Sequence, residues 1–74
     1  MVQTEKFNKK IYNNIKNKML EKEINLNKMA DILETSAQNL CKKLKKLEKG
    51  TGITTSSLFD IAFALGTTVE ELIK

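Results

Sequence analysis

The sequence contains no proline and only three glycines, at positions 50, 52 and 66, so little interrupts a helical backbone along its 74 residues. A β-sheet would need alternating apolar residues or β-branched runs, and only the short segment 53–55 offers one. We therefore predict an all-α chain. Its length and 41% apolar content suit one small domain, residues 1–74, with a core near the lower limit for folding alone.

Polar residues that can cap a helix recur along the chain, each ahead of an amphipathic segment. These expected helix starts are Thr4, Asn25, Ser36, Thr54 or Thr55, and Thr68. The fourth helix should cover roughly residues 55–65, and Gly50 and Gly66 suit the left-handed position that follows a helix end. The apolar residues expected to face the core are Phe7, Ile11, Ile15, Met19, Leu26, Met29, Ala30, Leu33, Ala37, Leu40, Leu44, Leu47, Leu58, Ile61, Ala62 and Leu65.

The segment from Ser36 to Gly50 is the most distinctive of these helices, because one side is apolar and the other is basic. At about 100° per residue, the side opposite the leucines carries amide and lysine side chains. They are Gln38, Asn39, Lys42, Lys45 and Lys46. A solvated helix face is the ordinary explanation of a lysine run, and a surface that binds an anionic partner is the alternative.

Charge is distributed unevenly along the chain. Residues 1–24 and 25–50 each carry six lysines and three acids, a net +3, whereas residues 51–74 carry one lysine and three acids, a net −2. A basic surface on the first two thirds suits a protein that binds a polyanion.

Several function classes are excluded by composition. The chain has no histidine, its acids form no visible carboxylate pair, and no phosphate-binding loop is present, so we expect no enzyme and no cofactor. Because Cys41 is the only cysteine, the chain can form neither an internal disulfide nor a cysteine-based zinc site, and we expect no metal. No apolar run approaches the ~18 residues that span a bilayer, and no signal peptide opens the chain, so we expect a cytoplasmic protein.

Three blocks of sequence resemble one family: INLNKMADILETSAQNL, LEKG, and SLFDIAFALGTTVEEL. Over roughly residues 11–73, their order and spacing resemble the Cro/phage-repressor (Xre-like) helix-turn-helix family. The resemblance implies a compact, five-helix, lambda-repressor-like domain that binds double-stranded DNA, commonly as a homodimer. It also implies a small bacterial or phage-encoded transcriptional regulator, a repressor, whose third helix enters the major groove of a palindromic operator.

Contact residues follow from this resemblance and from side-chain chemistry. Base contacts are expected from Ala37, Gln38, Asn39 and Lys42. Contacts to the DNA backbone are expected from Asn25, Asn27, Lys28, Ser36, Lys43, Lys45, Lys46 and Lys49. Candidates for the subunit contact are Phe59, Phe63, Val69 and Ile73, with core packing as the alternative for the two phenylalanines.

Three departures from the family pattern stand out. Glu34 occupies the turn position where the family usually has glycine, which a non-glycine residue reaches at some cost in strain. Lys43 stands at an often apolar position, and Leu44 can take over its packing. The stretch from Leu40 to Leu58 is about three residues longer than usual, close to one extra helical turn, which we place in KKLKKL.

Two other functions compete with this reading. The same fold can serve as a protein-interaction module of the antitoxin or anti-repressor type, whose main partner is a protein. KKLKKL can also be read as a membrane-surface helix, but its leucines are already needed for the core and it has no aromatic residue.

Overall fold

The computed structural model describes residues 2–74, and within them it contains five α-helices and no strand. The helices are α1 (Val2–Lys22), α2 (Leu26–Ile32), α3 (Ala37–Glu48), α4 (Thr55–Ala64) and α5 (Val69–Leu72). The prediction of an all-α, five-helix domain is confirmed.

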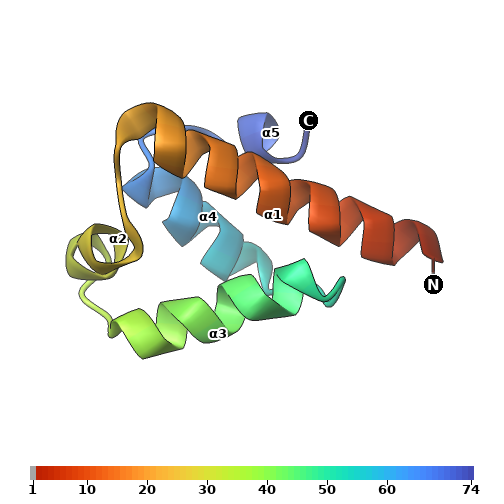
Figure 1. The fold of residues 1–74 in the computed structure, drawn as a ribbon, viewed down its shortest axis with the longest axis horizontal. Helices are drawn as coiled ribbons and strands as arrows, with labels where there is room; N and C mark the ends of the chain where they lie inside the picture. Colours follow the sequence, from red (N-terminus) through yellow and green to blue (C-terminus); the bar gives the residue numbers. More distant parts are fainter. Residues whose placement is uncertain (1) are drawn as a thin grey trace.

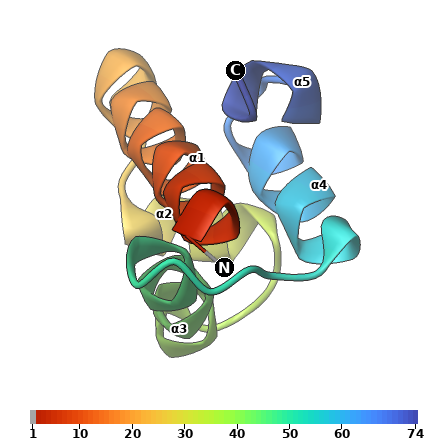
Figure 2. The same ribbon diagram turned by 90° about the vertical axis from the view of Figure 1, so that its right-hand side faces the viewer.

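The helices form two groups around a shared core. Helices α1 and α3 run along the long axis of the domain, with α2 at one end and α4 behind them (Figure 1). Seen from the side, α1 and α3 lie on one side of the molecule, and α4 and α5 lie on the other (Figure 2). The pairs in contact are α1 with α3 and α5, α2 with α3 and α4, and α4 with α5.

Four of the predicted helix caps are confirmed by hydrogen bonds. The Asn25 Oδ1 accepts from the Lys28 N–H at 2.8 Å, and the Ser36 Oγ accepts from the Asn39 N–H at 3.1 Å. Thr54 and Thr68 cap α4 and α5 in the same way, each through Oγ1 and the N–H three residues later. Each cap satisfies one of the N–H groups that a helix start leaves without a partner.

The predicted start of the first helix is wrong. Helix α1 begins at Val2, so Thr4 lies inside it, because nothing in this stretch breaks a helical backbone. Helix α4 ends at Ala64, one residue earlier than predicted, with Leu65 as its C-cap.

The core is formed by residues from all five helices together with Leu65, the C-cap of α4. Its buried apolar members are Ile11, Ile15, Met29, Ala30, Leu40, Leu44, Leu47, Ile61, Ala62, Ala64, Leu65 and Leu72. The partly buried members from the predicted set are Met19, Leu26, Leu33, Ala37 and Leu58. Phe7 was expected inside but is 47% exposed, because Asn8 takes the inward position on this turn of α1.

Asn8 links α1 to the end of α3. Its buried amide nitrogen donates to the Gly50 carbonyl at 2.9 Å, across 42 residues of sequence. Gly50 itself is buried and has a φ of 92°, and a Cβ atom there would lie 2.9 Å from the Cβ of Glu5. The first turns of α1 therefore fix where α3 ends.

Candidate nucleic-acid interface

Helix α3 has two sharply different faces. Its buried residues are Leu40, Leu44 and Leu47. Its exposed residues include Gln38, Asn39, Lys42, Lys45, Lys46 and Lys49 (the last as C-cap), which we call the α3 outer face. The predicted amphipathic helix is thus present, with amide groups near its start and lysines toward its end.

The lysines of the α3 outer face keep their charge available. The ion pairs among the described side chains are Lys18 with Glu21 and Lys74 with Glu71, and neither involves α3. A cationic surface whose lysines form none of these ion pairs attracts an anionic ligand over a range of about 8–10 Å at physiological salt.

Helix α2 and the turn after it set the position of α3. Glu34 has a φ of 53°, so it adopts the left-handed conformation that glycine would take more easily. The turn is held by backbone hydrogen bonds from the Glu34 N–H to the Asp31 oxygen at 3.2 Å and from the Thr35 N–H to the Ala30 oxygen at 2.9 Å. Glu34 therefore adopts the left-handed conformation of the turn, and the backbone hydrogen bonds of the turn still form.

The start of α2 carries polar groups and lies close to α3. Asn25, Asn27 and Lys28 are exposed. The Asn25 cap uses its side-chain oxygen, so the amide N–H groups remain donors, and the Ser36 hydroxyl likewise keeps its O–H. A hollow lined by Leu26, Cys41 and Lys45, among others, shows that α2 begins beside the middle of α3.

Two predicted contact residues are less exposed than the rest. Ala37 is partly buried and packs against the core, and Lys43 is partly buried on the flank of α3 between its leucine and lysine sides. Leu44 is buried beside it, as expected from the departure at Lys43. Cys41 is partly buried on the opposite flank.

The subunit-contact candidates belong to α4, to α5 and to its C-cap Ile73, and α4 and α5 lie on the opposite side of the molecule from α3 (Figure 2). Phe59 and Phe63 are 59% and 73% exposed, so the alternative that they pack in the core is wrong. Ile73 is 37% exposed, whereas Val69 is partly buried and packs against the core.

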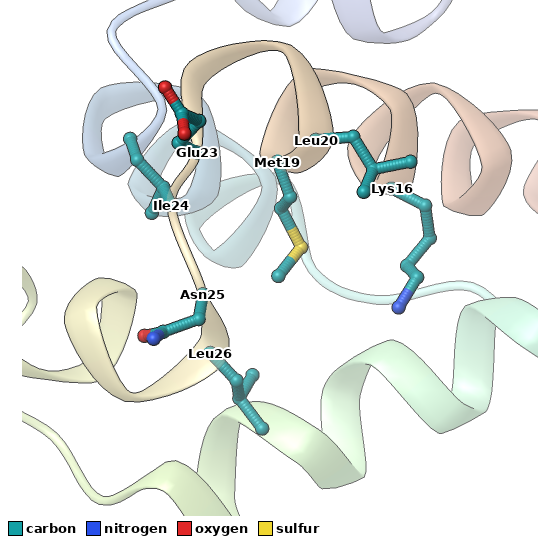
Figure 3. Close-up of a pocket in the computed structure, with 7 residues that line it drawn as sticks. All are labelled: Lys16, Met19, Leu20, Glu23, Ile24, Asn25 and Leu26. Carbon is teal, nitrogen blue, oxygen red and sulfur yellow. The ribbon is translucent and has the colours of Figure 1, made fainter.

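The structure contains a groove between α1 and α3 that the sequence did not predict. Two adjoining hollows, of about 500 Å³ and about 170 Å³, share Lys16, Met19 and Leu26 and follow the seam from the end of α1 to the middle of α3. Figure 3 shows the larger hollow, with Lys16 and Met19 descending from α1 on the side where Leu26 lies. Helical spacing places Lys16 one turn after Tyr12, a residue bordering the apolar stripe, but nothing in the sequence indicates the groove itself.

The same structure bears on metals and membranes. Among the described residues, no three His, Cys, Asp or Glu side chains come together as metal ligands would. No helix in the described part of the chain is both long enough and apolar enough to cross a membrane.

A short helix, a tight turn and a second helix with a polar, cationic outer face define a helix-turn-helix domain of the DNA-binding class. The model of the Cro/C1-type HTH DNA-binding domain family matches residues 14–74. The chain belongs to this family, as its sequence blocks predicted. No curated protein and no solved structure matches the chain. Residues 2–13, which form the first turns of α1, lie outside the family match.

Proposed function

We propose that this protein is a sequence-specific, Cro-like repressor that acts in the cytoplasm by inserting α3 into the major groove of a palindromic operator. The observation that carries the proposal is the α3 outer face, the exposed polar and cationic side of a helix whose start is capped by Ser36. A major groove about 12 Å wide accepts one α-helix. The proposed repression follows if the bound domain occupies promoter DNA.

Gln38, Asn39 and Lys42 are the proposed readers of bases. The side chains of Gln38 and Asn39 can each offer a donor and an acceptor to adenine N6 and N7, and Lys42 can donate to guanine O6 or N7. All three are exposed in the first half of α3. The Ala37 methyl is a proposed contact for a thymine methyl through the part of it that the core leaves open.

The remaining polar groups are proposed to bind phosphates. They are Asn25, Asn27, Lys28, Ser36, Lys43, Lys45, Lys46 and Lys49. Contacts of this kind orient the domain on the duplex and make affinity depend on salt, but they do not read sequence.

Two substitutions separate these roles on a duplex selected from a randomised pool. Gln38→Ala should weaken binding to the selected duplex by about 1–3 kcal/mol and leave binding to random duplex largely unchanged. Lys46→Ala, the matched change on the same face, should weaken both duplexes alike and reduce the slope of log K against log salt by about 0.9. Equal losses on both duplexes for Gln38→Ala would show that Gln38 does not read a base.

A homodimer through α4 and α5 is the proposed assembly, because Phe59 and Phe63 of α4 are large and exposed, and α4 lies on the opposite side of the molecule from α3 (Figure 2). Fully burying one exposed phenylalanine side chain contributes about 1.5–3 kcal/mol, and Phe59 and Phe63 are 59% and 73% exposed, so the four in a symmetric pair contribute about 4–8 kcal/mol. Association itself costs about 4–15 kcal/mol, so we expect a weak dimer that DNA strengthens by holding two copies about 34 Å apart.

Sedimentation tests the dimer. The double variant Phe59→Ser/Phe63→Ser should sediment as a monomer and lose cooperative binding to the selected duplex. Phe7→Ser, which removes an exposed phenylalanine from α1, is the matched control and should change neither property. A wild-type protein that stays monomeric at micromolar concentration and on DNA would remove the proposal.

A further inference from the structure

The groove between α1 and α3 carries cationic groups from two helices. Lys16 of α1 and Lys45 of α3 line the same hollow, together with Tyr12, Leu44 and Glu48. Lys16 also lines the adjoining hollow, which includes Asn25 at the start of α2. Lys16 therefore shares one hollow with Asn25, the N-cap of α2, and the other with Lys45 of α3, and the proposed function assigns both of these residues to the DNA backbone.

The direction of the Lys16 side chain fits this position. Figure 3 shows it leaving α1 and descending toward α3, with its ammonium group at the end that approaches α3. Lys16 is exposed, and the ion pairs among the described side chains do not include it. A lysine side chain can lay its apolar methylene groups along an apolar surface while its ammonium group stays in water, where it can meet a negative charge.

The proposed docking of α3 would bring a DNA backbone close to Lys16. If α3 lies in the major groove, one DNA backbone rises along the flank of α3 that faces the start of α2. Cys41 and Lys45 occupy this flank, and both line the hollow shared with Lys16 and Leu26. The backbone that meets Asn25 and Lys45 would thus run across the mouth of the groove in front of Lys16.

We propose that Lys16 is a further phosphate-binding residue, so that α1 joins α2 and α3 in holding the DNA backbone. This inference rests on the proposed insertion of α3 into the major groove. It extends the contact surface to a helix that otherwise serves the core, and it adds a contact that does not depend on base sequence.

The acidic groups of the groove offer a competing role for Lys16. Glu23 lines the larger hollow but lies at the far end of it, away from the Lys16 ammonium (Figure 3). Glu48 lines the smaller hollow together with Lys16 and Lys45. If Lys16 served only to neutralise Glu48 within the protein, Lys16→Gln would leave the salt slope of DNA binding unchanged in a protein that also carries Glu48→Gln. If a phosphate passes here, Lys16→Gln reduces the salt slope in the Glu48→Gln protein as well, because the lost contact is with DNA.

The test measures binding to a mixed-sequence duplex of about 20 base pairs, two turns of DNA, at salt concentrations between 50 and 200 mM. Each phosphate contact contributes about 0.9 to the salt slope, so Lys16→Gln should make the fall in affinity over this range about 3.5-fold smaller than for wild type. Lys16→Arg should restore the wild-type slope. Lys10→Gln is the matched control, because Lys10 is an exposed lysine of α1 that lines none of these hollows.

The outcomes separate this inference from the proposed function. A reduced slope for Lys16→Gln in both the wild-type and the Glu48→Gln protein, with a wild-type slope for Lys10→Gln, would support a phosphate contact at Lys16. Equal slopes for wild type, Lys16→Gln and Lys10→Gln would overturn it while leaving the helix-turn-helix function in place. A wild-type protein whose DNA binding shows no salt dependence would overturn both. Melting temperatures by circular dichroism confirm that each variant is folded.

Discussion

Replacing Gly50 by alanine should damage the domain far more than the loss of one hydrogen atom suggests. Gly50 has a φ of 92°, a conformation that costs an L-residue about 1–2 kcal/mol. The new Cβ would lie 2.9 Å from both the Cβ and the Cγ of Glu5 and 3.2 Å from its Cα. Because one of these atoms is backbone, α1 itself has to move.

The two effects add. Overpacking of this kind costs about 1–3 kcal/mol, so Gly50→Ala should lose about 2–5 kcal/mol in total. A domain of this size has about 4–11 kcal/mol of stability, and each kcal/mol corresponds to about 4–8 °C in melting temperature. We therefore expect a fall of at least about 8 °C, together with loss of the hydrogen bond from Asn8 to the Gly50 carbonyl.

The two other glycines provide the controls in the same thermal unfolding assay. Gly66 has a φ of 65° but its added Cβ would meet only the end of the Lys22 side chain at 3.5 Å, so Gly66→Ala should show the backbone cost alone. Gly52 has no such φ, and its added Cβ would make ordinary contacts with the Asn8 side chain at 3.5–3.9 Å, so Gly52→Ala should be neutral or slightly stabilising. If Gly50→Ala cost no more than Gly66→Ala, the close approach of α1 to the end of α3 would be wrong.

Two further predictions concern the turn and the last helix. Glu34→Gly should stabilise the domain by about 0.5–1 kcal/mol, because glycine adopts the left-handed conformation at φ 53° without strain. Glycine also raises the conformational entropy of the unfolded chain, which offsets part of this gain. A lower melting temperature of the variant would contradict the prediction. A side-chain hydrogen bond from Lys74 lowers the pKa of Glu71 below 4.5, so its small contribution to stability is present above the unfolded pKa and is lost as pH falls through the folded pKa. In an NMR titration, Lys74→Met should return the pKa of Glu71 toward 4.5, and an unchanged value would contradict the assigned cause.

Local chemistry made most of the fold predictable. Asn25, Ser36, Thr54 and Thr68 cap their helices because short polar side chains satisfy N–H groups at helix starts, an effect confined to a few residues. The apolar face of α3 was equally clear, since a spacing of three and four residues fixes which side is buried.

Long-range packing was not predictable in the same way. Phe7 continues the spacing of Ile11 and Ile15, yet Asn8 is the buried residue, because the carbonyl of Gly50 lies opposite it. Nothing near Asn8 in the sequence announces a partner 42 residues away. Phe59 and Phe63 show the converse, since their apolar character is compatible with a core and only the packing of α4 reveals that they face outward.

The residues of the candidate site were likewise predictable where they depend on local sequence and not where they depend on long-range packing. The residues of the α3 outer face were predictable because they share one helix and one periodicity. Lys16 was not, because its place in the groove depends on how α1 lies across α2 and α3. The individual contacts with bases and phosphates remain predictions.

We propose that α3 and the start of α2 form the DNA-binding surface, and an NMR titration can map that surface residue by residue. Uniformly ¹⁵N-labelled protein is titrated with the selected duplex, and the backbone amide shifts are followed residue by residue. The largest changes are expected within residues 36–49 and 25–28, with little change in α4 beyond what dimer formation produces. Changes concentrated in α4 and α5, with residues 36–49 unmoved, would contradict it.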